Sequence, residues 1–504
     1  MQNPSIIVKD LSIKNQDNFI LDGISFSLQQ GENLAILGSS GSGKTSLAKA
    51  IAGKIYFSGT ILFDENLSSA DPSSIKFVAQ ENSFKNLSGT SDFYYQQRFN
   101  SFDASDSPTV FDELLKVFNE NKSDRDKIKK IESGLKKLGI FYLKDAPLIQ
   151  LSSGEHKRFQ LIKALLSPSK LLILDSPFIG LDVESRKGLH EILNEISNDG
   201  TQLILISGTF SLPDCITHIA HLQNKNLVFF GEKEEFDFQQ MKDQQESETF
   251  SQPEIYPFEV QNSKAETIVK LVDIQIKYGD TTIIQNFNWK IKQGEKWLLK
   301  GPNGAGKSSL LNLITGDHPQ AYSNEIYLFG KRRGTGESIW EIKQRTGYVS
   351  SELHAYFDKQ ISCFDTIASG FFDTVGLYKK LTKDQYKIIL QWLDFLHLSS
   401  HVSNKPLHEI SSGIQRLIFL ARALVKNPPL LILDEPCQGL DFQQREQLIS
   451  LIDQICAGSE KTLIYVTHEE EDVPACIQKV LQLEAGKQTF FDRKKRHSLD
   501  AVLY

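Results

Sequence analysis

Along this chain, short apolar runs typical of buried strands are followed by segments with apolar positions at helical spacing. This succession of patterns occurs twice. Short apolar runs at residues 34–37 and 297–300 each lead directly into a glycine-rich segment. Residues 46–52 and 309–314, which follow these segments, repeat apolar positions at helical spacing. A strand, a glycine-rich loop and a helix in this order form a recurrent unit of α/β proteins. The pattern therefore predicts two copies of one α/β domain.

The duplication extends over nearly the whole chain, because corresponding motifs recur at an offset of about 260 residues. We expect residues 1–235 to form the first domain and residues 267–497 the second. Residues 236–266, rich in Gln, Glu, Asp and Ser, are predicted to be a solvated linker. Residues 110–145 and 373–398 have helical and mostly polar patterns, which predicts a small helical subdomain inserted in each α/β core.

Composition narrows the class of protein. The net charge of −7 and the pI near 5.9 disfavour a general nucleic-acid binder, which is usually basic. The five cysteines are scattered without a Cys-x-x-Cys pair, which predicts reduced thiols and a cytoplasmic protein. No apolar run approaches the roughly 18 to 20 residues that span a bilayer. If the protein serves a membrane process, we expect another chain to supply the membrane part.

The two glycine-rich segments carry the chemistry. Residues 38–45 and 301–308 both match the phosphate-loop pattern G-x-x-x-x-G-K-[ST]. Backbone N–H groups of such a loop wrap the β-phosphate, and the helix that follows adds its positive N-terminal dipole. We expect Lys44 and Lys307 to reach the β- and γ-phosphates of a nucleoside triphosphate. The adjacent hydroxyls, from Thr45 and Ser308, are expected to bind Mg²⁺.

Two further apolar runs, residues 171–174 and 430–433, each end in one acid, Asp175 or Asp434. A continuous apolar run is typical of a parallel strand buried on both faces. A carboxylate at the end of such a strand is well placed to hold the Mg²⁺ shell. Asp175 and Asp434 are therefore the second pair of candidate Mg²⁺ ligands.

A more specific motif lies before each of these runs. Leu151-Ser-Ser-Gly-Glu155 and Ile410-Ser-Ser-Gly-Ile414 resemble the LSGGQ signature of ATP-binding cassette (ABC) ATPases, and residues 180–182 and 439–441 resemble the D-loops of that family. The resemblance implies two tandem P-loop NTPase domains of α/β fold. Each would have a RecA-like parallel-sheet core, an N-terminal antiparallel β-subdomain and an inserted helical subdomain. It also implies head-to-tail pairing, with each ATP between one cassette's phosphate loop and the other's signature.

By the same resemblance, the second cassette keeps the residues that hydrolyse ATP. Glu435 stands where the family has its general base, and His468 where it has its switch histidine. Tyr278 falls where an aromatic side chain stacks on adenine. One departure is Ser351, which occupies the position of the Q-loop glutamine.

The first cassette departs at more positions. Ser176 stands at the base position and Gly208 at the switch-histidine position. Asn15 replaces the aromatic residue, although Phe19 is close enough in sequence to substitute, and Gln80 is retained. Losing a positioned base typically costs about 10² to 10⁴ in rate. We therefore expect the site on the first phosphate loop to bind ATP with slow or no turnover, through either drift or selected regulation.

The candidate residues form three sets. The catalytic set is Glu435, His468 and Lys307. The Mg²⁺ set is Thr45, Asp175, Ser308 and Asp434. The ATP-binding set is Gly38, Gly41, Gly43, Lys44, Thr45, Ser46, Gln80, Tyr278, Gly301, Asn303, Gly304, Gly306, Lys307, Ser308, Ser309, Ser152, Gly154, Ser411 and Gly413.

Residues 315–337, 348–351 and 423–441 are similar to the ModF-like branch of tandem-cassette ATPases, also described as molybdate-transport-associated or photorepair-type. The resemblance implies an ATPase subunit that energises a membrane permease, of molybdate type, at the inner face of the cell membrane. A soluble ABC ATPase acting on a protein or nucleic-acid partner remains the alternative, although the acidic charge makes nucleic acid the less favoured partner. His318 and residues 331–333 are expected to be surface residues and not an anion site.

Overall fold

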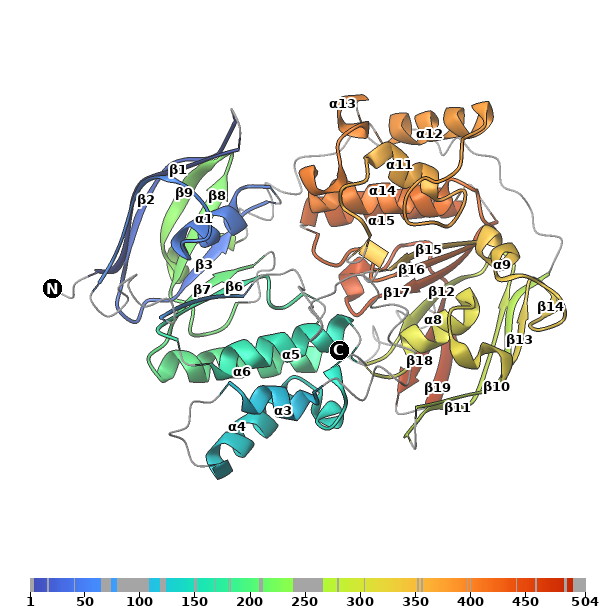
Figure 1. Cartoon of the computed structure of the whole chain (residues 1–504), viewed down its shortest axis with the longest axis horizontal. Coiled ribbons are helices and arrows are strands. Elements are labelled where there is room, and N and C mark those ends of the chain that lie inside the picture. The colour runs from blue at the N-terminus through green and yellow to red at the C-terminus, as the bar shows by residue number, and fades with distance from the viewer. Residues whose placement is uncertain are drawn as a thin grey trace, which may run out of the picture. The chain divides into compact units, whose positions relative to one another are not determined.

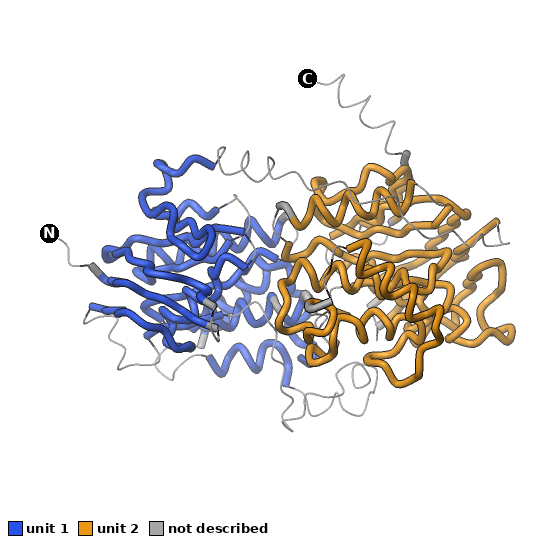
Figure 2. The backbone as a smooth tube through the Cα atoms, turned by 90° about the horizontal axis from the view of Figure 1, so that it is seen from above, with its two compact units in different colours: residues 1–247 blue, residues 248–504 orange. Residues whose placement is uncertain are grey.

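A computed structural model of the chain forms two compact units, residues 1–247 and 248–504 (Figure 2). Among the described residues, two hydrophobic clusters belong to the first unit and two to the second. The structure describes residues 4–15, 18–39, 41–64, 74–78, 108–117, 124–148, 151, 153–167, 169–179, 181, 183–207, 212–238, 266–278, 281–302, 304–350, 353–354, 357–396, 398, 400–440, 442–457, 460–484 and 487–492.

The first unit alternates strands and helices (Figure 1). Its strands are β1 (Pro4–Asn15), β2 (Asn18–Gln29), β3 (Leu34–Leu37), β4 (Ser58–Phe63), β5 (Ile75–Val78), β6 (Leu171–Asp175), β7 (Gln202–Ile206), β8 (His218–Gln223) and β9 (Asn226–Glu232). Its helices are α1 (Lys44–Ile51), α3 (Val110–Leu115), α4 (Asp124–Lys137), α5 (Ser153–Leu166) and α6 (Val183–Asn198), with 3₁₀ turns η2 (Phe141–Leu143) and η4 (Lys233–Glu235).

The second unit repeats this order. Its strands are β10 (Thr267–Tyr278), β11 (Thr281–Lys292), β12 (Lys296–Lys300), β13 (Glu325–Leu328), β14 (Lys331–Arg332), β15 (Thr346–Ser350), β16 (Leu430–Asp434), β17 (Thr462–Val466), β18 (Lys479–Glu484) and β19 (Lys487–Asp492). Its helices are α8 (Lys307–Thr315), α9 (Ile339–Arg345), α11 (Cys363–Ser369), α12 (Lys383–Phe395), α13 (Ser400–Ser403), α14 (Ser412–Leu424) and α15 (Phe442–Ala457), with 3₁₀ turns η5 (Pro319–Tyr322), η6 (Leu407–Glu409) and η7 (Glu470–Asp472).

The main sheets of the two units correspond strand for strand. The main sheet has the order β5-β6-β7-β3-β8-β9 in the first unit and β15-β16-β17-β12-β18-β19 in the second. Only the last pair of each sheet is antiparallel. Each unit also has a separate antiparallel sheet, ordered β2-β1-β4 or β11-β10-β13-β14. The predicted fold, a parallel α/β core with an antiparallel β-subdomain, is therefore confirmed.

The continuous apolar runs form central strands because both faces of the main sheet are covered. Successive residues of β3 point to opposite faces, so that Leu34 and Ile36 pack under the antiparallel sheet and α1. Ala35 and Leu37 belong to the cluster on the other face, which includes residues of α5 and α6. Figure 1 shows α5 and α6 along that face, with α3 and α4 beyond them. These outer helices, with α11–α13 in the second unit, lie within or beside the stretches predicted to be helical subdomains.

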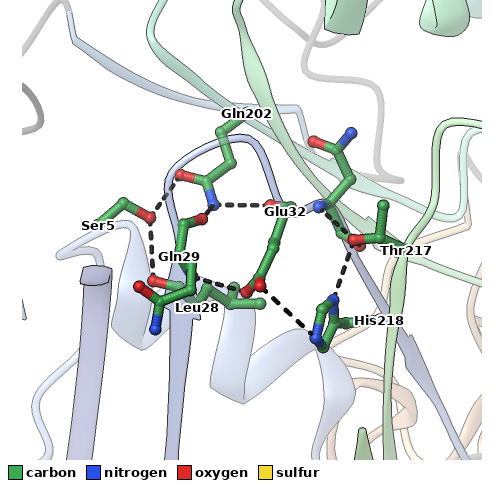
Figure 3. Close-up of polar contacts among 8 residues, drawn as sticks. Ser5, Leu28, Gln29, Glu32, Gln202, Thr217 and His218 are labelled. Carbon is green, nitrogen blue, oxygen red and sulfur yellow. Dashed lines mark hydrogen bonds and ion pairs between the residues drawn. The ribbon is translucent and has the colours of Figure 1, made fainter. Parts of the chain in front are cut away.

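A polar network joins the antiparallel sheet of the first unit to its main sheet (Figure 3). The Gln202 amide donates to the carbonyl oxygens of Gln29, at 3.0 Å, and Glu32, at 2.6 Å. Its oxygen accepts from the Ser5 hydroxyl at 2.8 Å. The Glu32 carboxylate lies 3.8 Å from His218 on β8. Buried polar groups are stable only when they are paired, so this network fixes how the two sheets meet.

Candidate ATP sites

The two phosphate loops have the same backbone conformation. Gly41 and Gly43 have φ of 79° and 96°, and their counterparts Gly304 and Gly306 have 80° and 93°. These left-handed values favour glycine, which lacks a Cβ. Helices α1 and α8 begin directly after Gly43 and Gly306, so the unpaired N–H groups of each first turn lie next to the loop. Each loop thus has the geometry that binds a phosphate.

The loop lysines fold back over their own loops. Lys307 donates to the carbonyl oxygens of Gly301, at 2.7 Å, and Pro302, at 3.0 Å. Lys44 donates to the corresponding carbonyl oxygens of Gly38 and Ser39, both at 2.7 Å. In both units, therefore, the ammonium group lies at the loop, where a bound phosphate would meet it.

The first unit brings its two candidate Mg²⁺ ligands together. The Thr45 hydroxyl donates to Asp175 at 2.9 Å, and the Ser176 hydroxyl to the same carboxylate at 3.2 Å. Burial raises the pKa of Asp175, while these hydrogen bonds and the charges of Lys49 and Lys44 oppose the rise. The Thr45 hydroxyl on α1 and the Asp175 carboxylate at the end of β6 are oxygen ligands of the kind that Mg²⁺ prefers, so these residues fit that ion.

In the second unit the residue after the strand acid, Glu435, is held from two sides. Nε2 of His468 lies 3.1 Å from Oε1 of Glu435, and the Gln438 amide donates to Oε2 at 2.9 Å. Burial acts to raise the pKa of Glu435, but His468, Lys307 and Arg416 outweigh it and bring this pKa below its ordinary value. A half-buried carboxylate that stays ionised can accept a proton from water.

The first unit has the same backbone at this point without the carboxylate. Ser176 and Glu435 both have left-handed φ, 53° and 50°. The N–H of Ser176 donates to Ile206 on the neighbouring strand at 3.0 Å, as that of Glu435 does to Val466 at 2.9 Å. The two units therefore differ in the side chain at this position and not in the fold.

Both signature segments open a helix, as the sequence indicates. Ser411 caps α14, its hydroxyl accepting from the N–H of Ile414 at 3.4 Å. Gly413 lies in the first turn of α14, and a Cβ there would lie 2.4 Å from the Gln444 side chain. Gly154 lies in the first turn of α5. The signature glycines are thus at helix N-termini, where backbone N–H groups are available to a phosphate.

Several candidate residues lie outside the described part of the chain: Gln80, Ser152, Gly208, Asn303 and Ser351. Tyr278 is described as the last residue of β10, by its backbone alone. Phe19 on β2 is described, and the Lys14 ammonium lies 4.2 Å from its ring centroid. The roles of all these residues, and the head-to-tail pairing of the cassettes, stay predictions.

One expectation is wrong. His318 and Arg333 are buried, whereas Lys331 and Arg332 are exposed as expected. His318 accepts a hydrogen bond from the N–H of Gln320, and Arg333 lies 3.4 Å from the Glu337 carboxylate. His318 therefore stabilises the 3₁₀ turn η5, and Arg333 stabilises the connection between β14 and α9.

Sequence reasoning did not find Gln438 or Arg416 as neighbours of Glu435. Gln438 closes a turn on Glu435, its N–H donating to the Glu435 carbonyl at 3.2 Å. The sequence contained one signal for Gln438: it follows Glu435 by three residues after a strand end, which is the spacing of a turn. Arg416 donates to the Gln438 carbonyl at 3.0 Å from α14, and no local pattern indicates that contact.

Comparisons with known proteins agree with this geometry. The family model described as ABC transporter matches residues 21–179 and 284–438. The ABC transporter ATP-binding protein ModF of Escherichia coli is 36% identical over 90% of this chain and 91% of its own length. An uncharacterised ABC transporter ATP-binding protein of Schizosaccharomyces pombe is 31% identical over 93% of this chain and 95% of its own.

A more distant relative of similar length, the ribose import ATP-binding protein RbsA of Caldanaerobacter subterraneus, is 23% identical over 96% of this chain and 95% of its own length. The family matches cover both phosphate loops and both strand-end acids, and the strand order that surrounds them is the same in each unit. The chain therefore belongs to the ABC transporter ATP-binding family and is a ModF-like ABC ATPase with two tandem cassettes.

Proposed function

We propose that the second cassette carries the ATP hydrolysis of this protein, and that the first binds ATP with slow or no turnover. The observation that carries the proposal is the pair of strand ends. Glu435 is a half-buried carboxylate held by His468 and Gln438, whereas Ser176 has the same backbone conformation and only a hydroxyl. A general base contributes about 10² to 10⁴ in rate, so its loss alone separates the two sites.

Each residue of the second site has a role in this proposal. The loop N–H groups of Gly304 and Gly306 and the ammonium of Lys307 bind the β- and γ-phosphates. Glu435 accepts the proton of the attacking water, and His468 contacts the γ-phosphate. Because the Glu435 side chain is half-buried, its charge acts where the dielectric constant is below that of water and electrostatic contacts are stronger.

The remaining candidates surround the nucleotide. Ser46, Ser309 and Asn303 complete the two loops, Tyr278 stacks on adenine, and Gln80 contacts the nucleotide of the first site. Ser152 and Gly154 face the γ-phosphate at the second loop, and Ser411 and Gly413 face it at the first.

Magnesium would be held in each site by a loop hydroxyl and a strand-end carboxylate, Thr45 with Asp175 and Ser308 with Asp434. A bound Mg²⁺ ion would neutralise charge on the β- and γ-phosphates. The close approach of Thr45 and Asp175 supports this assignment.

We further propose that the ATPase energises a separate membrane permease from the inner face of the cell membrane. Among the residues that the structure describes, no helix has the length and apolar character to cross a bilayer. The relatives named for transport, one of them for ribose import, support an energising role. By resemblance to ModF the transported solute would be molybdate.

The variant Glu435→Gln tests both parts, because it should bind ATP and lose hydrolysis by at least about 100-fold. Single-turnover assays of the unmodified protein should show that one of the two sites hydrolyses ATP, and equal hydrolysis at both sites would overturn the asymmetry.

The test of the permease uses the same variant, loaded with ATP and isolated from solubilised membranes and from the soluble fraction. A polytopic permease in stoichiometric amount supports transport. A stoichiometric protein or ribosomal partner found only in the soluble fraction contradicts it.

A further inference from the structure

Glu435 lies in a three-part arrangement that none of the family motifs explains. Its Oε2 accepts from Nε2 of Gln438 at 2.9 Å. The carbonyl of Gln438 in turn accepts from Nη2 of Arg416 at 3.0 Å. Arg416 is only 6% exposed and lies on α14, the helix that the second signature opens. The turn at residues 435–438 thus holds the carboxylate through Gln438, and α14 holds the turn through Arg416.

We propose that Gln438 is a positioning residue for ATP hydrolysis, which holds the Glu435 carboxylate in the orientation that accepts the proton of the attacking water, while Arg416 fixes the turn that carries Gln438. The inference rests on the proposed role of Glu435 as the base. It assigns Gln438 no contact with nucleotide.

The geometry supports orientation and not merely packing. The terminal torsion of a carboxylate is broad, and contacts at both oxygens restrict it more than a contact at one; here Oε1 lies beside His468 and Oε2 accepts from Gln438. An ionised carboxylate has about four lone-pair sites, so two contacts leave capacity for a water molecule. The amide therefore limits the orientation of Glu435 without blocking its reaction.

The first cassette offers an internal comparison. Ile179 stands at the position of Gln438, and its N–H closes the same turn on Ser176, at 3.4 Å. The turn is thus conserved between the two units while the donor and the carboxylate that it would hold are both absent from the first. This joint absence is expected if the amide serves the carboxylate.

The test measures ATP turnover and ATP affinity of the full chain carrying Gln438→Met, which keeps the side-chain volume and removes the donor. We expect kcat to fall roughly 10- to 100-fold, as for a misplaced reacting group, with the dissociation constant for ATP unchanged. The matched control is Gln391→Met at an exposed position on α12, with kcat unchanged. If Gln438→Met folds poorly, Gln438→Asn shortens the reach of the amide and gives the same comparison.

A double variant separates positioning from a structural role. If Gln438 acts through Glu435, adding Gln438→Met to Glu435→Gln should cause no further loss in single-turnover rate. The same proportional loss in both backgrounds, or a kcat within about twofold of the unmodified protein, would overturn the inference. Full activity of Glu435→Gln alone would instead overturn the proposed base, so the two failures are distinguishable.

Discussion

At the scale of single residues, one backbone position decides how the two cassettes differ. Left-handed φ at a residue other than glycine is uncommon and costs free energy, yet Ser176 and Glu435 both adopt it after a buried strand. The parallel strands and the hydrogen bonds to Ile206 and Val466 impose this conformation in both units. The side chain at that position then sets the chemistry.

Restoring a carboxylate alone should not restore hydrolysis in the first cassette. Ser176→Glu fits the backbone, but Ile179 and Gly208 offer no group to hold the new carboxylate. In the Glu435→Gln background we expect Ser176→Glu to change turnover less than about twofold, because an unoriented base contributes little. Adding Ile179→Gln and Gly208→His should raise the single-turnover rate above that of Ser176→Glu. A large gain from Ser176→Glu alone would contradict this prediction.

Asp472 should make stability depend on pH. Burial, with Glu469 and Glu471, raises the pKa of Asp472 from 3.8 to about 6, against the opposing effect of Arg445. Between these two values the folded state keeps a proton that the unfolded state has released. The contribution of Asp472 to the free energy of unfolding therefore falls as pH rises through this window, and stays low above it.

The variant Asp472→Asn removes this titration. At pH 7 we expect its free energy of unfolding to exceed that of the unmodified protein by roughly 1 to 3 kcal/mol, and the difference to shrink as pH falls toward the lower end of the window. Urea unfolding at several pH values measures it, with the exposed Asp394→Asn as control. If the variant were more stable than the unmodified protein by the same amount at every pH, the raised pKa of Asp472 would not be the cause.

At the scale of elements, the phosphate loop depends on close contact between backbones. Gly301 follows β12 with φ of 157°, and a Cβ there would lie 2.5 Å from the Leu483 carbonyl oxygen on β18. Gly38 has the equivalent contact with Leu222 at 2.3 Å. The glycine that begins each motif is thus required by the neighbouring strand as well as by the phosphate.

Replacing Gly301 by Ala should therefore move the loop or the strand. We expect Gly301→Ala to lower stability by about 1 to 3 kcal/mol and to weaken ATP binding. Gly336→Ala is the matched control, because Gly336 has φ of 109° but no atom within 4 Å of its Cβ position. Thermal unfolding and nucleotide titration compare the two variants. Equal losses of stability in the two variants would show that positive φ causes the effect, and would contradict a role for the close contact with the Leu483 carbonyl oxygen.

At the scale of the whole molecule, the chain contains two cores that fold from separate sequence. Residues 1–247 and 248–504 each form a compact unit with its own main sheet. A unit of this size buries enough apolar surface to be stable alone. The duplication therefore predicts independent folding.

Each half, expressed alone, should fold cooperatively. We expect residues 1–247 and 248–504 each to show one sigmoidal urea transition and helical circular dichroism, because each unit has its own hydrophobic clusters on both faces of its main sheet. The half ending at residue 504 should also bind ATP, since its phosphate loop is complete. A half that remains unfolded while the full chain is folded would mean that the units depend on one another.

Local rules explain why the sequence alone predicted the fold and much of the candidate sites. A glycine at left-handed φ, an apolar run ending in Asp434 and a signature that opens a helix act within a few residues, so residue type and spacing determine them. The duplication, the phosphate loops and the missing carboxylate at Ser176 were readable for the same reason.

The tertiary structure decided which side chains meet. Gln438 in the turn and His468 after β17 lie at Glu435 because a parallel sheet places its strand ends at one edge, and Arg416 on α14 packs against the same turn through the Gln438 carbonyl. His318 is buried, and not exposed as its polar character suggested, because the chain packs over it. Such contacts join segments that are distant in the chain, and their energies depend on packing that no local pattern encodes.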